Sequence, residues 1–336
     1  MLVNKYPASS RMFDWIFTFF TGLWTAGAYI DGWAHTHLES SLESFFTPWH
    51  AVFYFGLFAT GVSLVVCVWI NHKKGYPLRF ALPKEYIFAF IGLIISFVAG
   101  VGDMLWHLTF GIEVGVEALL SPTHLLLAIG GAVMVAGPLS AVWYRHKSHP
   151  IHSGPTILSA AYFLAVITFM FQFLHPFNMP WMAESFFLKN PIPIDFAVAL
   201  GVANIVFFTV TFVGLALSTV RHWVFPFGSF TIILFINTLA ATLMESAYYQ
   251  FIWTALIAGI LIDILYYVLI RRGQRSMHHI HLFSFWAPFI LVSVYMATIY
   301  VTDTIAWSIH TWTGSIFIAG IFGYLMSHLV IPFQKS

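Results

Sequence analysis

The chain has 336 residues, of which 60% are hydrophobic, 19% aromatic and 8% charged, and its mean hydropathy is +0.84. This composition excludes a water-soluble globular domain and predicts a polytopic protein embedded in a lipid bilayer. The net charge of +1 gives no reason to expect a nucleic-acid partner, and the single cysteine, Cys67, rules out disulfides and thiolate metal sites.

Ten apolar runs, each long enough to cross a bilayer, follow one another along the chain. They cover residues 12–34, 48–71, 85–108, 122–144, 154–174, 194–220, 228–247, 251–270, 282–304 and 312–332. Strands are not expected, because the runs lack alternation and a lone strand cannot satisfy its backbone in lipid. We therefore predict an all-α, polytopic integral membrane protein in which residues 1–336 form a single transmembrane domain of about ten helices.

Lysine and arginine residues lie almost entirely on one side of these predicted helices, and the opposite loops contain only Lys189. By the positive-inside rule, both termini are expected to be cytoplasmic and the acidic loops to face the extracytoplasmic side of the cell membrane. Histidines in the basic loops, such as His152, are expected to be solvated or to contact lipid headgroups.

A polar motif interrupts the apolar sequence twice, at residues 31–50 and 103–124. Both copies read Asp, three residues, His, a gap, Glu, three residues, Glu, three residues, Ser or Thr, Pro, any residue, His. The copies differ in length by two residues, between the first His and the first Glu. We interpret them as an internal repeat of helical hairpins, residues 12–71 and 85–144, with a degraded third copy at 154–220.

The spacing within each motif predicts a metal site. Asp31 and His35 are four residues apart and share a helix face. Thr47 is typical of an N-cap with Pro48 after it, which places His50 in the first turn of the returning helix. A carboxylate and two imidazoles then meet at one point, as in sites for copper, zinc or non-haem iron. The predicted ligands are Asp31, His35, His37 and His50 in the first copy and Asp103, His107 and His124 in the second.

The glutamates and His37 extend this prediction. Glu43 and Glu117 are expected to handle protons, and the glutamates of both copies are also placed to ligate or to orient a histidine. His37 has no counterpart in the second copy, where Thr109 stands. The alternative for any one Asp–His pair is a plain hydrogen bond between helices.

The duplicated Asp-x3-His motif with a later His resembles the copper site in the C subunit of the particulate methane and ammonia monooxygenases. That subunit is also helical and polytopic, and it carries a second, related site with Asn in place of Asp. The resemblance implies copper at Asp31, His35 and His50 and again at Asp103, His107 and His124. This chain departs from the family in its longer gaps to the last His, its Glu-x3-Glu insert and its larger number of predicted helices.

These observations favour a copper-dependent, monooxygenase-like oxidoreductase that acts on a small substrate, with zinc or iron as other metals for the same donors. A haem, flavin or nucleotide motif is not visible, so a quinol or an external protein is expected to donate electrons, and partner membrane subunits or an oligomer are compatible with this. A transporter of metal ions or small molecules is the first alternative, and a zinc-dependent membrane hydrolase is the second.

Overall fold

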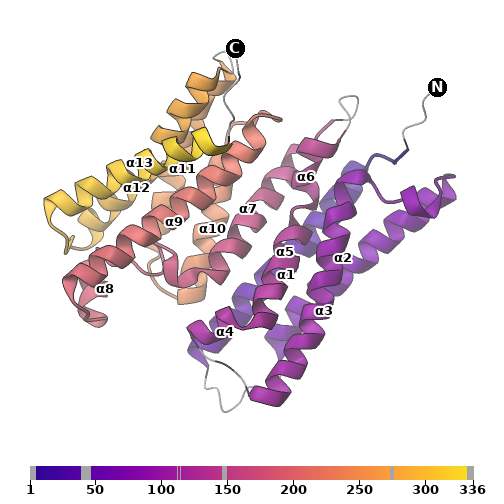
Figure 1. The fold of residues 1–336 in the computed structure, drawn as a ribbon, viewed down its shortest axis with the longest axis horizontal. Coiled ribbons are helices and arrows are strands. Elements are labelled where there is room, and N and C mark those ends of the chain that lie inside the picture. Colours follow the sequence, from indigo (N-terminus) through magenta and orange to yellow (C-terminus); the bar gives the residue numbers. More distant parts are fainter. Residues whose placement is uncertain are drawn as a thin grey trace. The chain divides into compact units, whose positions relative to one another are not determined.

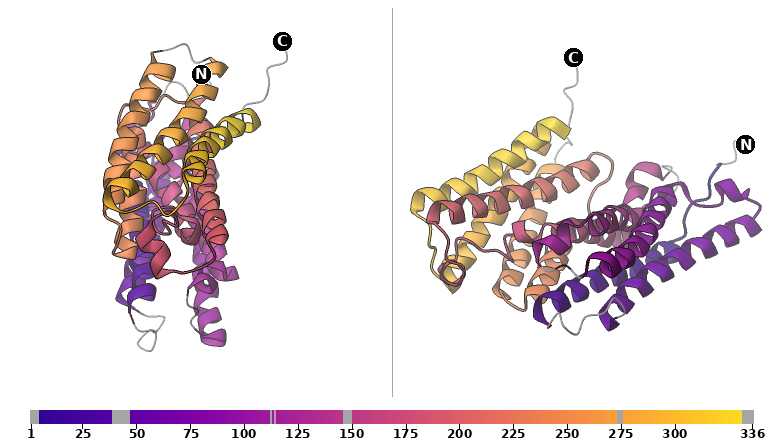
Figure 2. Two further views of the ribbon diagram at one scale, coloured as in Figure 1. Left: turned by 90° about the vertical axis from the view of Figure 1, so that its left-hand side faces the viewer. Right: turned by 60° about the horizontal axis from the view of Figure 1, so that its bottom comes forward.

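The protein is helical throughout the part that the computed structural model describes. The described residues are 5–38, 47–111, 113, 115–145, 150–272 and 276–330. All ten predicted apolar runs coincide with helices (Figures 1 and 2). Within these described ranges, seven helices are long and apolar enough to cross a membrane, and one bent pair, counted as a single span, brings the number to eight. The all-helical, membrane-type fold is therefore confirmed for these residues, whereas ten spans and the side on which the termini lie are not.

The chain divides into two compact units, Met1–Met170 and Phe171–Ser336. The single transmembrane domain expected for residues 1–336 stays a prediction. Both copies of the motif belong to the first unit. The predicted third copy, residues 154–220, crosses the boundary between the units, because its first helix belongs to one unit and its second to the other.

The first unit consists of two long hairpins and a closing helix (Figure 1). Its elements are α1 (Arg11–His37), α2 (Pro48–Lys73), η2 (Leu78–Phe80), η3 (Lys84–Tyr86), α3 (Ile87–Phe110), α4 (Val116–Leu120), α5 (Pro122–Val135), α6 (Gly137–Tyr144) and α7 (Ser153–Met170). Helix α1 packs along α2, and α3 packs along α5. Helices α5 and α6 are bent by 54° against each other, at a point where Pro138 opens α6 and cannot continue the backbone ladder of α5.

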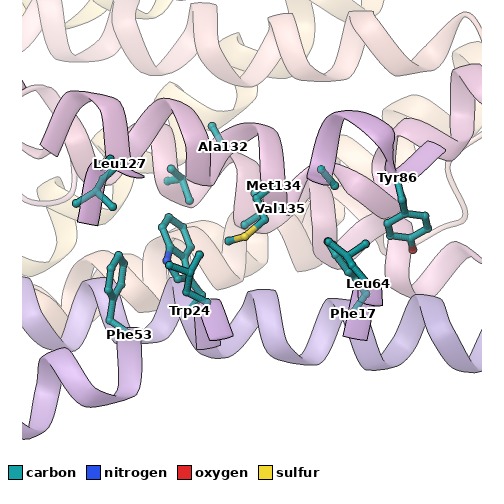
Figure 3. Close-up of a cluster of buried hydrophobic side chains, with 13 residues drawn as sticks. Phe17, Trp24, Phe53, Leu64, Tyr86, Leu127, Ala132, Met134 and Val135 are labelled. Atoms are coloured by element: carbon teal, nitrogen blue, oxygen red, sulfur yellow. The ribbon is translucent and has the colours of Figure 1, made fainter. Parts of the chain in front are cut away.

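Aromatic and aliphatic side chains from both hairpins form the core of this unit (Figure 3). Trp24 of α1 is 2% exposed, and its ring lies against Gly131 of α5, where a Cβ would stand 1.9 Å from the indole. Phe53 of α2 packs on Trp24 with ring centroids 5.0 Å apart. Trp24 therefore fastens the first hairpin to the second.

A buried ionic cluster lies where α1 begins. Arg145 donates to Asp14 Oδ2 at 2.9 Å and to Glu85 Oε1 at 3.1 Å, and the three side chains are 2–3% exposed. His152 Nδ1 lies 2.6 Å from Asp14 Oδ2, and Tyr86 donates to Asp14 Oδ1 at 2.7 Å. The prediction that His152 is solvated was wrong, because its Nδ1 contacts the buried carboxylate of Asp14.

The second unit is a separate helical bundle. Its elements are η4 (Gln172–Leu174), α8 (Glu184–Lys189), α9 (Ile194–Val220), α10 (Ser229–Glu245), α11 (Gln250–Tyr266), η5 (Tyr267–Arg271), α12 (Met277–Thr302) and α13 (Ile309–Val330). Asp263 of α11 accepts hydrogen bonds from the backbone N–H groups of Phe230 and Thr231 and so caps α10 from a neighbouring helix. His175 is buried, with Nδ1 accepting from Phe177 N–H and Nε2 3.0 Å from Asn237, so it is a satisfied core histidine.

Candidate metal centres

The first hairpin brings Asp31, His35 and His50 together. His50 Nε2 is 3.3 Å from Asp31 Oδ1, and His35 Nε2 is 3.7 Å from Asp31 Oδ2. Asp31 and His35 lie one turn apart near the end of α1, whereas His50 lies in the first turn of α2. One ligand atom from each residue falls within 4.8 Å of the other two.

The second hairpin repeats this arrangement with Asp103, His107 and His124. His107 Nε2 is 3.4 Å from Asp103 Oδ2, and His124 Nε2 is 3.5 Å from Asp103 Oδ1. The first two residues come from the last turns of α3, and the third comes from the first turn of α5. Six of the seven predicted ligands thus form two groups of three, one in each hairpin.

The separations of the ligand atoms are compatible with a metal site. An N–H···O hydrogen bond is about 2.7–3.2 Å long, and each of the four nitrogen–oxygen distances, 3.3–3.7 Å, exceeds that range. Two ligands of a tetrahedral ion, each about 2.0–2.1 Å from it, are about 3.3 Å apart. The side chains therefore have the spacing of groups that surround an ion.

The N-cap residues orient the histidine of each returning helix. Thr47 Oγ1 accepts from the backbone N–H of His50 and lies 2.9 Å from its Nδ1. Ser121 Oγ accepts from the backbone N–H of His124 and lies 2.6 Å from its Nδ1. In both copies one hydroxyl caps the helix and engages Nδ1, which leaves Nε2 directed at the carboxylate. A partner on the second ring nitrogen is typical of metal-binding histidines.

His107 Nδ1 has the backbone oxygen of Gly111 as its hydrogen-bond partner at 3.3 Å, and Glu113 lies beside the same nitrogen. Its Oε2 lies 3.3 Å from His107 Nδ1, and its Oε1 accepts a hydrogen bond from the indole of Trp106. The predicted role of a glutamate as an orienting group thus has a geometric counterpart in the second copy. The matching Glu39 and the predicted proton-handling residue Glu43 lie outside the described residues.

Two other predicted site residues stand apart from the two groups. His37 Nδ1 lies 3.0 Å from the backbone oxygen of Trp33, and the two rings stack, so this imidazole is engaged by its own helix. Glu117 is exposed on α4. Neither is a member of a three-ligand group among the described side chains, and a role for either stays a prediction.

Sequence reasoning missed Tyr54, which lies between the two sites. Its ring is 6.1 Å from that of His50, one turn away on α2, and it reaches across to Gly100 of α3, where a Cβ would meet the tyrosine ring at 3.1 Å. The carboxylates of Asp31 and Asp103 both act electrostatically on it. The sequence does show one difference that points to this residue: Tyr54 follows His50 by four residues, whereas Ala128 stands at the matching position after His124.

Two glycines at matched positions allow each hairpin to close. Gly56 lies six residues after His50, and Gly130 lies six residues after His124. A Cβ at Gly56 would stand 2.5 Å from the backbone nitrogen of Trp24, and one at Gly130 would stand 2.7 Å from that of Ser96. The backbones of the paired helices therefore touch just below each site.

Gly56→Ala is expected to separate α1 from α2 and to weaken the first site alone. Overpacking of this kind costs about 1–3 kcal/mol of folding free energy. Thermal unfolding and metal content per chain would measure the effect. Gly314→Ala is the control, because its Cβ meets no atom within 4 Å. Equal melting temperatures for the two variants would refute this account of the crossing.

Comparison with known proteins identifies no relative: the chain matches no family model, no curated protein and no solved structure. The class that fold and site define is therefore a helical, membrane-type protein with a duplicated group of one aspartate and two histidines. That description comes from the chain's own geometry.

Proposed function

We propose that this protein is a membrane metalloprotein that binds one transition-metal ion in each hairpin and acts as a copper-dependent, monooxygenase-like oxidoreductase on a small substrate. The observation that carries the proposal is the duplicated group of one carboxylate and two imidazoles, with ligand atoms within 4.8 Å of one another. Ionisable groups are costly in a membrane and are retained where they pair or work. Here the same three ionisable groups, one aspartate and two histidines, occur in each of the two hairpins.

The donor set supports an open site rather than a closed structural one. Structural ions are bound by four protein ligands, whereas catalytic ions keep a position for water or substrate. Each hairpin supplies three ligands, so at least one position remains for a small molecule. Imidazole and carboxylate donors suit copper, iron and zinc, and the motif's resemblance to the monooxygenase copper site favours copper.

The chain's own residues have separate tasks in this proposal. The aspartate and histidines hold the ion, which when bound would supply the redox chemistry. The N-cap hydroxyls and Glu113 fix the imidazoles, so that the ligands are arranged before the ion arrives. Tyr54 closes the space between the sites. Electrons would come from a quinol or an external protein.

Metal analysis of the purified protein tests the first step. We expect about two copper ions per chain, and one after His35→Ala or His107→Ala, because each variant removes a ligand from one group. Copper-loaded protein supplied with a quinol should consume dioxygen when its small substrate is added. Protein that binds no metal would refute the proposal, and stable binding of zinc alone would favour the hydrolase alternative.

Uptake of copper or zinc into liposomes, abolished by His35→Ala, would instead favour transport. A pathway needs cation ligands on both sides of the membrane. At the far end of α1, Asp14 and the neighbouring Glu85 of η3 are both paired with Arg145. This pairing supports a site rather than a pathway.

A further inference from the structure

The two metal sites share their ligands but differ in their surroundings. The side chain of Asp103 is 2% exposed and that of Asp31 is 19% exposed. The histidines one turn further on differ in the same direction: the side chain of His107 is 8% exposed and that of His35 is 21% exposed. The histidines of the returning helices reverse it, because His124 is 26% exposed and His50 is 12% exposed. The second site is thus closed around its carboxylate and open beside His124.

One substitution between the copies explains how the second carboxylate is held. Thr123 donates a hydrogen bond to Asp103 Oδ1 at 2.9 Å. At the matched position of the first copy stands Trp49, whose indole N–H is buried without a hydrogen-bond partner in the described part of the chain. An indole has one donor on a rigid ring, and here that donor does not reach Asp31.

Glu113 lies against a second ligand of this site, His107. Its two oxygens engage His107 Nδ1 and the Trp106 indole, so the glutamate is itself anchored. The hydrogen-bond partner of His107 Nδ1 is the backbone oxygen of Gly111 at 3.3 Å, and the carboxylate of Glu113 beside it adds a favourable negative charge. Asp103 and His107 are therefore both held from behind, and less freedom is lost when an ion binds.

We propose that the two sites divide the work: Asp103, His107 and His124 retain their ion, whereas Asp31, His35 and His50 exchange theirs. Thr123 and Glu113 are the positioning residues that make the second site retentive. This inference rests on the proposed metal binding and adds an order of affinity to it. Retention at one site keeps an ion in place while the other site stays available to incoming metal or substrate.

Release of Zn²⁺ to an excess of chelator tests the division, because zinc suits these donors and has no redox chemistry. The full-length protein, loaded with zinc, should release two ions in a fast and a slow phase. His35→Ala should remove the fast phase. Glu113→Gln and Thr123→Val should each speed the slow phase by about 10–100-fold, the usual effect of losing an outer-shell partner.

The matched control is Asp195→Asn, which removes an exposed carboxylate from the start of α9 and should leave both phases unchanged. Trp49→Thr should slow the fast phase, because a threonine at this position would donate a hydrogen bond to Asp31 as Thr123 does to Asp103. A single release rate for two ions, or a slow phase that Glu113→Gln and Thr123→Val leave unchanged in folded protein, would overturn the division alone. Absence of bound zinc would overturn the proposed function with it.

Discussion

Replacing Asp31 and Asp103 together by alanine is expected to leave a folded protein that binds no metal and has no oxidoreductase activity. Each aspartate is the ligand that both histidines of its group face, through Oδ1 on one side and Oδ2 on the other. Its loss leaves two neutral imidazoles with no anionic donor. The affinity should fall further than the about 10–100-fold that accompanies loss of an outer-shell partner.

The single variants separate the two sites in the same experiment. Asp31→Ala and Asp103→Ala should each retain one ion per chain, as measured by elemental analysis of protein that elutes as a folded species. Asp195→Ala serves as the control for a lost carboxylate outside both groups. Unchanged metal content in the double variant would place the ions elsewhere and remove the basis for the proposed function.

The grouping of the aspartate and two histidines in each hairpin could be predicted because its geometry is local. Asp31 and His35 are one helical turn apart, and a Thr-Pro pair fixes where the next helix begins. Helix periodicity and capping alone therefore place His50 in the first turn of its helix, and the hairpin brings that turn beside Asp31 and His35. His175 falls in the degraded third copy, which lacks the matching aspartate, and it proved to be a satisfied core residue.

The surroundings of the sites were less predictable, because they depend on contacts between segments distant in the sequence. Tyr54 reaches Gly100 across the two hairpins, and no short-range pattern signals that contact. The hydropathy pattern also did not determine the number of membrane-spanning helices. Apolar length alone does not distinguish a helix that crosses the membrane from a shorter one such as α10, which has 17 residues. The division into two units has no mark in composition either.

The buried ionic cluster likewise could not be predicted from short-range sequence patterns. Asp14, Glu85, Arg145 and His152 come from four segments of the chain, separated by up to 138 residues, and none belongs to a motif. Burial by itself would lower the pKa of Arg145, but the charge of Asp14, its hydrogen bond and the charge of Glu85 outweigh burial and raise the pKa. The guanidinium therefore stays charged, and its single positive charge is shared between two buried carboxylates.

Arg145→Met is expected to destabilise the protein by about 3–5 kcal/mol, because removing one partner leaves buried charge without compensation. Arg145→Lys should recover part of the loss, since it restores the charge but not the planar group that reaches both carboxylates. Thermal unfolding in detergent would measure both effects. Combining Arg145→Met with Asp14→Asn and Glu85→Gln removes the uncompensated charges, and stability should return toward that of the parent.

Metal content separates this stabilising role from a role in the sites. Asp14 and Asp31 are 17 residues apart on one helix, which corresponds to about 26 Å along its axis. The cluster is thus remote from the metal ligands, and the fraction of Arg145→Met protein that remains folded should still bind about two ions per chain. If the folded variant loses metal while its melting temperature stays unchanged, the cluster acts on the sites through α1, and its assignment as a structural anchor is wrong. If stability falls and metal per folded chain persists, the two ends of the first unit have distinct tasks: one holds the helices together and the other binds the ions.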